Sequence, residues 1–240
     1  MDKLLVERGL VASRERAQRL ILAGKVLVDE QKVDKAGSQV AADCAIRLLG
    51  GDLKYVSRGG LKLERALAHW SIDVAGKLCL DVGASTGGFT DCLLQHGAAR
   101  VIAIDTGYGQ MDFKLRQDPR VCLMEKTNAR YLTADTIADP IGALVCDASF
   151  IGLTTLLPAP LALCAPGAWA VALIKPQFEA GPAAVGSKGV VRDPAVHQAV
   201  CDRIHAWWSA LSGWRVLGIT ESPITGPEGN REFLIAAVRD

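Results

Sequence analysis

Four charged residues are expected at one edge of a sheet, three of them because they stand at the ends of apolar runs that predict buried strands. Asp147 and Lys175 each follow an apolar run directly. Glu232 precedes the last such run, and Lys62 lies near the start of an amphipathic stretch. Partial burial and a neighbouring cation favour the neutral form of a lysine, whereas carboxylates oppose this and fix its orientation. A lysine tuned in this way can accept a proton from a sugar hydroxyl. The alternative is a purely structural ion pair between Asp147 and Lys175.

A glycine-rich segment follows the apolar run 78–80 and precedes an amphipathic stretch that ends at His96. This order predicts a strand, a tight turn and a helix, in which glycine permits positive φ angles and close approach to a ligand. The helix N-terminus then offers unpaired N–H groups to an anion. The spacing is neither that of a dinucleotide fingerprint nor that of a P-loop. The candidate ligand-binding residues here are Asp81, Gly83, Ala84, Ser85, Thr86, Gly87, Gly88 and Phe89.

A second apolar run, residues 101–104, ends at Asp105. It lies about twenty residues beyond the turn, where an acidic residue can bind both hydroxyls of a ribose. A ligand with a carboxylate at one end and an adenosine ribose at the other fits S-adenosylmethionine, which we expect as the cofactor. The alternative is an ordinary strand, turn and helix without a ligand.

The elements that must position these residues alternate between strands and helices. Apolar runs predict strands at 78–82, 100–105, 120–124, 142–147, 168–174, 214–220 and 232–238. Helices are expected at 61–70, 88–96, 111–117, 133–138, 152–165 and 195–211. This pattern predicts an α/β fold with a mostly parallel sheet covered on both faces. The carboxyl ends of parallel strands share one rim, and an antiparallel last strand would bring Glu232 there too.

Residues 1–50 follow a different pattern and are expected to form a small α+β domain, joined by a linker at 51–57 to a second domain at 58–240. Helices are predicted at 2–9 and 14–23, followed by short strands. Residues 1–62 contain 12 Lys and Arg against 8 Asp and Glu, while the rest of the chain has a net charge of −3. A basic front end favours an anionic macromolecule as partner, with a merely solvated arginine face as the alternative.

Composition excludes several classes of protein. No apolar run approaches the roughly 20 residues of a membrane span. The seven cysteines are never spaced as C-x-x-C and mostly lie in apolar runs. They are therefore expected to be buried thiols in a reducing cytoplasm. No Cys or His pairs have the spacing of metal ligands, so we expect a cytoplasmic protein without a metal site.

The segment from Leu5 to Val28 has the pattern Leu-x-x-x-Gly-Leu-x-x-Ser-Arg-x-x-Ala-x-x-Leu-Ile-x-x-Gly-x-Val-x-Val. This pattern resembles the S4 RNA-binding domain. The resemblance implies that basic side chains of this domain face RNA phosphates, which gives affinity but little sequence information. The residues expected at RNA are Lys3, Arg14, Arg16, Arg19 and Lys25, together with Arg58 from the following domain.

Further motifs stand at the predicted rim and in its loops. They are Ser57-Arg58-Gly59-Gly60-x-Lys62-Leu63, Asp105-x-Gly107-Tyr108-Gly109-Gln110, Thr127-Asn128-Ala129-Arg130, Asp147-x-Ser149-Phe150-Ile151, Lys175-Pro176-Gln177-Phe178-Glu179 and Gly226-Pro227-x-Gly229-Asn230-x-Glu232. With segment 81–89 they resemble the TlyA (hemolysin A) family, and the resemblance covers essentially the whole chain in order. It implies a Rossmann-like, FtsJ-type class I methyltransferase with seven strands, the last antiparallel. The implied reaction is 2′-O-methylation of a cytidine in ribosomal RNA.

The resemblance also assigns roles to individual residues. It implies a catalytic tetrad formed by Lys62, Asp147, Lys175 and Glu232. Lys175 would accept the hydroxyl proton, Lys62 and Glu232 would set its position, and Asp147 would lie near the sulfonium. Tyr108 and Asn128 would border the cofactor. The long loop 176–193, which contains several glycines, is expected to act as a lid over the substrate.

One departure from the family and two alternative functions remain. Family members often have an Arg-x-Trp-Val tetrapeptide where this chain has Leu53–Val56. The chain resembles a shorter subtype that acts on large-subunit RNA. A non-catalytic RNA-binding or ribosome-assembly factor is one alternative. A membrane-active hemolysin is the other, disfavoured because no strongly amphipathic cationic helix is predicted. The sequence leaves open the modified nucleotide and the oligomeric state.

Overall fold

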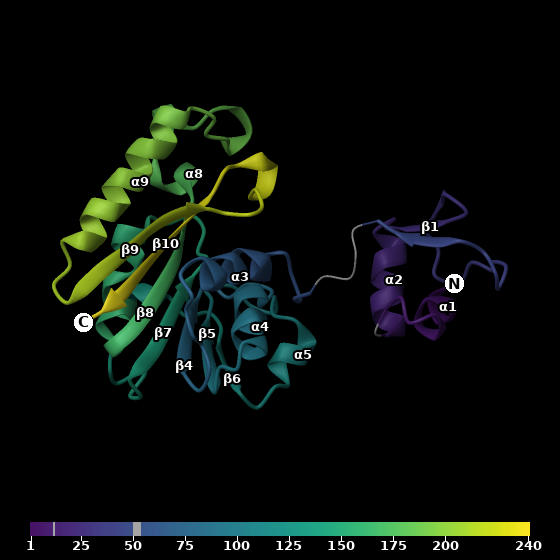
Figure 1. Cartoon of the computed structure of the whole chain (residues 1–240), viewed down its shortest axis with the longest axis horizontal. Coiled ribbons are helices and arrows are strands. Elements are labelled where there is room, and N and C mark those ends of the chain that lie inside the picture. Colours follow the sequence, from purple (N-terminus) through teal and green to yellow (C-terminus); the bar gives the residue numbers. More distant parts are fainter. Residues whose placement is uncertain (12, 50–53) are drawn as a thin grey trace. The chain divides into compact units, whose positions relative to one another are not determined.

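The computed structural model describes residues 1–11, 13–49 and 54–240, which form two compact units, Met1–Lys54 and Tyr55–Asp240 (Figure 1). Part of the predicted linker, residues 51–53, lies outside the described residues. The second unit begins at Tyr55 because its side chain is buried in the same hydrophobic core as Leu63 and Leu67. Within the described ranges, no helix is long and apolar enough to cross a membrane.

The first unit packs two helices against a small antiparallel sheet. Its elements are α1 (Asp2–Glu7), α2 (Arg14–Leu22), β1 (Val26–Val28), β2 (Gln31–Val33) and β3 (Ile46–Leu48), with strand order β2-β1-β3. The core contains Leu5, Ala17 and Ile21. The hydroxyl of Ser13 accepts a hydrogen bond from the Arg16 N–H at 3.2 Å, so Ser13 is the N-cap of α2.

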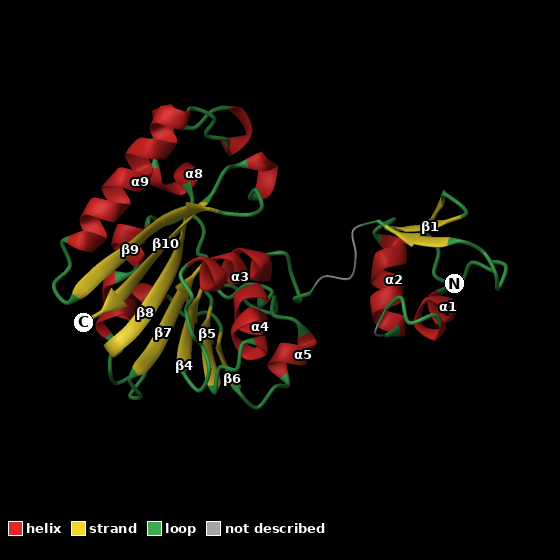
Figure 2. Ribbon diagram, in the orientation of Figure 1, coloured by secondary structure: helices red, strands yellow, loops and turns green. Residues whose placement is uncertain are grey.

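A seven-stranded sheet forms the centre of the second unit (Figure 2). Its strands are β4 (Leu78–Val82), β5 (Arg100–Ile104), β6 (Val121–Met124), β7 (Ile141–Cys146), β8 (Cys164–Ile174), β9 (Trp214–Glu221) and β10 (Phe233–Arg239). The order is β6-β5-β4-β7-β8-β10-β9, and β10 is antiparallel to both of its neighbours. The predicted α/β fold with a mostly parallel sheet and an antiparallel last strand is therefore confirmed. The chain reverses its direction of winding at β4, which makes the carboxyl end of β4 a switch point where ligands collect.

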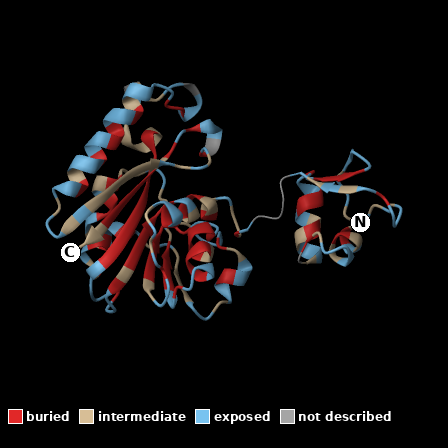
Figure 3. Cartoon of the chain, in the orientation of Figure 1, coloured by how far each residue is buried: buried red, intermediate tan, exposed pale blue. Residues whose placement is uncertain are grey.

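Helices cover both faces of this sheet, and the central strands are buried, whereas the edge strands β6 and β9 are only partly buried (Figure 3). One face packs against α3 (Gly59–His69), α4 (Gly88–Gln95) and α5 (Phe113–Arg116). The other face packs against α6 (Leu153–Leu156), α7 (Pro158–Ala162) and α9 (Pro194–Ser209). Along α9, Val200, Ile204 and Trp208 are buried, so the apolar stripe of this helix is a core face. Short helices fill the loops: α8 (Pro176–Glu179), η1 (Ala129–Tyr131), η2 (Pro182–Ala184), η3 (Ser187–Gly189) and η4 (Pro227–Gly229).

Two predicted helices are wrong. The helix expected at 152–165 is two short helices, because Pro158 lacks an N–H and starts α7 as a new first turn. The chain then enters β8 at Cys164, earlier than the predicted 168. The helix expected at 133–138 is a turn closed by N–H groups of Thr136 and Ile137 on the Thr133 carbonyl. Its β-branched threonines, and a proline at 140, disfavour continuation as a helix.

Candidate active site

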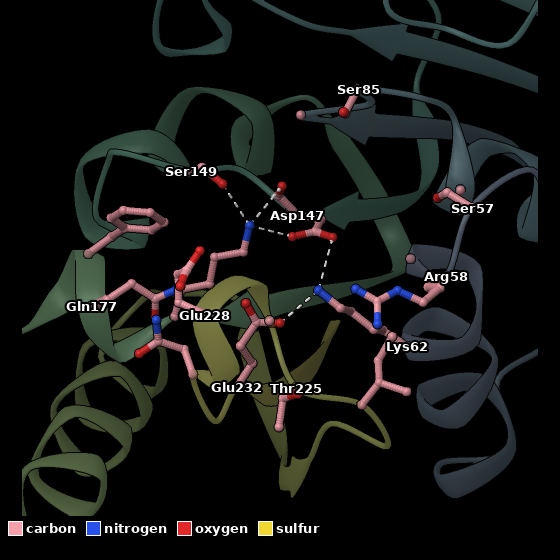
Figure 4. Close-up of a pocket in the computed structure, with 18 of the residues that line it drawn as sticks. Ser57, Arg58, Lys62, Ser85, Asp147, Ser149, Gln177, Thr225, Glu228 and Glu232 are labelled. Carbon is pink, nitrogen blue, oxygen red and sulfur yellow. Dashed lines mark hydrogen bonds and ion pairs between the residues drawn. The ribbon is translucent and has the colours of Figure 1, made fainter. Parts of the chain in front are cut away.

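The four charged residues at the predicted rim meet in one cluster. Figure 4 labels three of them, Lys62, Asp147 and Glu232. Lys62 Nζ lies 2.7 Å from Glu232 Oε2 and 3.6 Å from Asp147 Oδ2. Lys175 Nζ lies 2.6 Å from Asp147 Oδ1 and donates a hydrogen bond to Ser149 Oγ at 2.9 Å. Asp147 thus bridges the ammonium groups of Lys62 and Lys175, and Glu232 contacts that of Lys62.

Sheet register explains why residues so distant in the sequence meet. Asp147 and Lys175 directly follow the parallel strands β7 and β8, so both project beyond the same edge. In the antiparallel pair β8–β10, Phe233 lies opposite Ile174, which places Glu232 at that edge as well. Lys62 reaches it from the first turns of α3.

The cluster is largely withdrawn from solvent and faces a cavity of about 690 Å³, the tetrad cavity. The side chains of Lys62 and Lys175 are each 9 % exposed, that of Asp147 is 19 % exposed and that of Glu232 is fully buried. Two ammonium groups against two carboxylates balance the formal charge, which limits the cost of burying them. An amine held in this way can exchange a proton with a hydroxyl group bound in the cavity.

Residues 83–88 form the glycine turn, and most of them line the tetrad cavity as well. The predicted residues that line it are Gly83, Ala84, Ser85, Thr86, Gly88 and Phe89. Gly83 has a φ of +83°, and a Cβ there would lie 2.9 Å from the Cα of Ala148, so only glycine allows this close approach. Gly87 has a φ of +94° and precedes α4, but it packs against Leu115 and does not line the cavity.

Asp81, which the sequence predicts at the ligand, lies under the turn instead of in a cavity. It is fully buried, and Thr90 Oγ1 on α4 donates a hydrogen bond to its Oδ2 at 2.6 Å. Burial raises the pKa of Asp81 to about 7, which the Thr90 hydrogen bond partly offsets. The side chains of β4 alternate, so Asp81 points into the α4 layer while Leu80 and Val82 point into the other. This hydrogen bond joins β4 to α4, the two elements on either side of the glycine turn.

We expect Asp81→Asn to change how stability depends on pH. A carboxyl whose pKa is raised on folding contributes stability that is complete below its ordinary pKa near 4. That stability is lost as the pH rises through about 7. Between these two pKa values the loss of stability is on the order of 4 kcal/mol. Asparagine cannot ionise, so the variant should lose less stability between pH 5 and pH 8 than the wild type in urea unfolding. Equal losses of stability in the two proteins would contradict a raised pKa of Asp81 in the folded state.

A second cavity of about 520 Å³, the Asp105 cavity, adjoins the first and shares Gly83, Ser85, Asp147, Ser149 and Phe150 with it. Asp105 and Asn128 line this cavity. Asp105 accepts hydrogen bonds from the N–H groups of Ser85 at 2.7 Å and Gly107 at 2.6 Å. Each carboxylate oxygen keeps a lone pair for a ribose hydroxyl. Two joined cavities, one with a carboxylate and one with the glycine turn, suit an elongated nucleoside ligand with a charged tail.

Tyr108 lines neither cavity. Its ring is 71 % exposed, and the Lys126 ammonium lies 4.6 Å from the ring centre. The segment predicted to act as a lid forms short helical turns, and Val185, Lys188 and Gly189 from it line the tetrad cavity.

Sequence reasoning assigned no role to several residues of the site. Ser149 contacts the Lys175 ammonium, and Phe150 next to it is 89 % exposed with a left-handed backbone, φ +67°. Gln177 lines the tetrad cavity, and its amide oxygen is buried without a hydrogen-bond partner. The signal was present in the motifs, because Ser149 and Gln177 each stand two residues after a charged residue of the cluster.

The basic residues expected at RNA divide between the two units. In the first unit Lys3, Arg14, Arg19 and Lys25 are exposed and Arg16 is half-buried. Arg14 makes an ion pair with the buried Asp2 at 3.0 Å, so its orientation is set within the domain. Arg58 belongs to the second unit, where it is exposed and lines the tetrad cavity.

Comparisons with known proteins agree with this architecture. Residues 55–239 match the profile of FtsJ-like methyltransferases, and residues 1–43 match that of the S4 domain. A candidate rRNA methyltransferase of Bacillus subtilis, YqxC, is 50 % identical over 98 % of this chain and 84 % of its own length. The 16S/23S rRNA (cytidine-2′-O)-methyltransferase TlyA of Mycobacterium tuberculosis is 44 % identical over 98 % of this chain and 88 % of its own. The structure of a candidate hemolysin from Streptococcus thermophilus has a TM-score of 0.77, with 42 % identity over 99 % of this chain and 87 % of that one.

Proposed function

Because this chain belongs to the FtsJ-like methyltransferase family and begins with an S4 domain, we propose that it methylates the 2′-oxygen of a cytidine in ribosomal RNA. S-adenosylmethionine is its cofactor. The large-subunit RNA is the favoured target, and the reaction takes place in the cytoplasm with the RNA. The observation that carries the proposal is the cluster of two lysines and two carboxylates in a cavity that the glycine turn also lines.

The residues of the Asp105 cavity and the glycine turn would hold the cofactor, whose sulfonium supplies an electrophilic methyl group. Asp105 would accept hydrogen bonds from the ribose hydroxyls, and the first turn of α4 would face the carboxylate. These residues fit such a ligand because Asp105 lines one cavity, the first turn of α4 lines the other, and the two cavities adjoin.

Lys175, in its neutral amine form, would take the proton from the ribose 2′-hydroxyl as the oxygen attacks, and it would become the ammonium that pairs with Asp147. Asp147 Oδ1 and Ser149 Oγ fix the position of its ammonium. Lys62, between Glu232 and Asp147, keeps the two carboxylates from repelling each other. Transfer is an in-line displacement, so alignment of the hydroxyl is expected to supply much of the rate.

The S4 unit would give affinity through phosphate contacts. We expect the double variant Arg19→Gln, Lys25→Gln to weaken RNA binding and to reduce the slope of log affinity against log salt by about 1 to 2. The affinity for S-adenosylmethionine should not change. A matched control is Arg100→Gln, Arg215→Gln, because these exposed arginines stand at the amino ends of β5 and β9, away from the rim. Equal salt slopes for the two double variants would contradict phosphate contacts by the S4 unit.

Ribose-methylation mapping of ribosomal RNA, with and without the protein and S-adenosylmethionine, tests the function directly. One new 2′-O-methylcytidine that depends on both is the expected result. Calorimetry with the cofactor separates the main alternative, because a ribosome-assembly factor without catalysis would give no binding heat and no methylation.

A further inference from the structure

Glu179 joins the two loops that carry the reacting side chains. The Asp147 loop, residues 147–152, runs from β7 to α6, and the Lys175 segment, residues 175–179, runs from β8 through α8. Glu179 Oε1 accepts a hydrogen bond from the Leu153 N–H, the first of α6, at 2.7 Å. The N-cap position of α6 is Gly152, which has no side chain to accept this bond. Glu179 therefore caps α6 from 26 residues away.

Arg203 of α9 completes this contact. Its Nη2 lies 3.1 Å from Glu179 Oε2 and donates to the Glu179 backbone carbonyl at 2.6 Å. The Glu179 side chain is only 3 % exposed, whereas that of Arg203 is 52 % exposed. Burial raises the pKa of Glu179, and the Leu153 amide and Arg203 both act against that rise. A carboxylate buried so deeply with partners from two other elements is a built connection rather than a surface ion pair.

The two loops are thus tied at both ends. At one end Lys175 contacts Asp147 and Ser149, and at the other Glu179 binds the N–H of Leu153. Between these ends the rings of Phe150 and Phe178 lie 5.0 Å apart. Phe150 has a left-handed backbone although its ring is 89 % exposed, so burial of the ring does not stabilise that conformation. Strain of this kind persists only where surrounding contacts impose it.

We propose that Glu179, oriented by Arg203, is a positioning residue for catalysis: it holds the Asp147 loop against the Lys175 segment so that Lys175, Asp147 and Ser149 stay in contact. The inference rests on the proposed methyl transfer. Glu179 supports the reacting side chains and not the cofactor-binding part of the site, because the glycine turn makes none of these contacts.

The test is Glu179→Ala in the full chain, assayed for tritium transfer to ribosomal RNA well below its melting temperature. Loosened loops should lower kcat by about 10- to 100-fold. The Kd for S-adenosylmethionine should stay unchanged. Glu179→Gln keeps an oxygen for the Leu153 N–H, so its kcat should be closer to that of the wild type than to that of the alanine variant. Arg203→Met, which leaves that bond in place, should lower kcat less than Glu179→Ala.

A double-variant comparison distinguishes positioning from plain stabilisation. If Glu179 acts through Lys175, then Glu179→Ala should cause no further loss of kcat in a Lys175→Ala background. The control is Glu221→Gln, which removes an exposed ion pair with Arg231 and should leave kcat unchanged. Unchanged kcat in Glu179→Ala, a parallel rise in cofactor Kd, or additive losses with Lys175→Ala would each overturn the proposal. Absence of methylation by the wild type would instead refute the proposed function.

Discussion

Replacing Lys175 by alanine is expected to abolish most methyl transfer while leaving cofactor binding intact. The variant removes the amine that contacts Asp147 Oδ1 at 2.6 Å and Ser149 Oγ at 2.9 Å. Loss of a positioned proton acceptor lowers rates by about 10²- to 10⁴-fold. Single-turnover tritium transfer to ribosomal RNA at saturating S-adenosylmethionine measures the effect. Calorimetric titration with the cofactor should give a wild-type Kd, because no residue of the Asp105 cavity is altered.

Two further variants make this expectation specific to the amine. Lys175→Arg keeps the positive charge beside Asp147 but cannot give up its proton, so it should be nearly as inactive as the alanine variant. Lys175→Met should be similarly inactive. Because methionine fills a similar volume, this variant shows that the loss of activity does not come from the cavity that alanine would leave. Methylation by either variant at the wild-type rate would rule out Lys175 as the proton acceptor.

Sequence reasoning located the rim because its physical basis is general. Parallel strands all end at one edge, so a charged residue directly after an apolar run has few other places to lie. Lys62 and Glu232 are separated by 170 positions in the chain, yet their side chains make a buried hydrogen bond at 2.7 Å. An antiparallel last strand was sufficient to predict that Glu232 would reach this edge.

Contacts that depend on how loops approach one another were not predictable in this way. Asp81 follows the apolar run 78–80 and is predicted at the ligand, but it lies inside β4, and its side chain packs in the α4 layer, where Thr90 binds it. Similarly, no local pattern indicates that Glu179 caps α6, because its partner is a backbone N–H brought near by two separate strands. The continued apolar pattern past Leu157 also concealed the break at Pro158.

Asp105→Ala is expected to produce the opposite phenotype from Lys175→Ala, with cofactor binding weakened and the reacting cluster untouched. The variant removes the acceptor of the Ser85 and Gly107 N–H groups and both oxygens proposed to hold the ribose. Loss of hydrogen bonds to a charged group should raise the Kd for S-adenosylmethionine by about 10²-fold, or on the order of 3 kcal/mol. Asp105→Asn keeps one acceptor oxygen, so its Kd for S-adenosylmethionine should lie between those of the wild type and Asp105→Ala.

The Asp105→Ala variant is expected to raise the KM for S-adenosylmethionine and to leave kcat in place. An interaction made equally in the bound ground state and in the transition state changes KM and leaves kcat in place. High cofactor concentrations should therefore restore methyl transfer by Asp105→Ala, whereas none should restore it in Lys175→Ala. If Asp105→Ala bound the cofactor as the wild type does, the Asp105 cavity would not hold the ribose. If kcat stayed low at saturation, Asp105 would act on the reacting cluster through Ser85, a residue that lines both cavities.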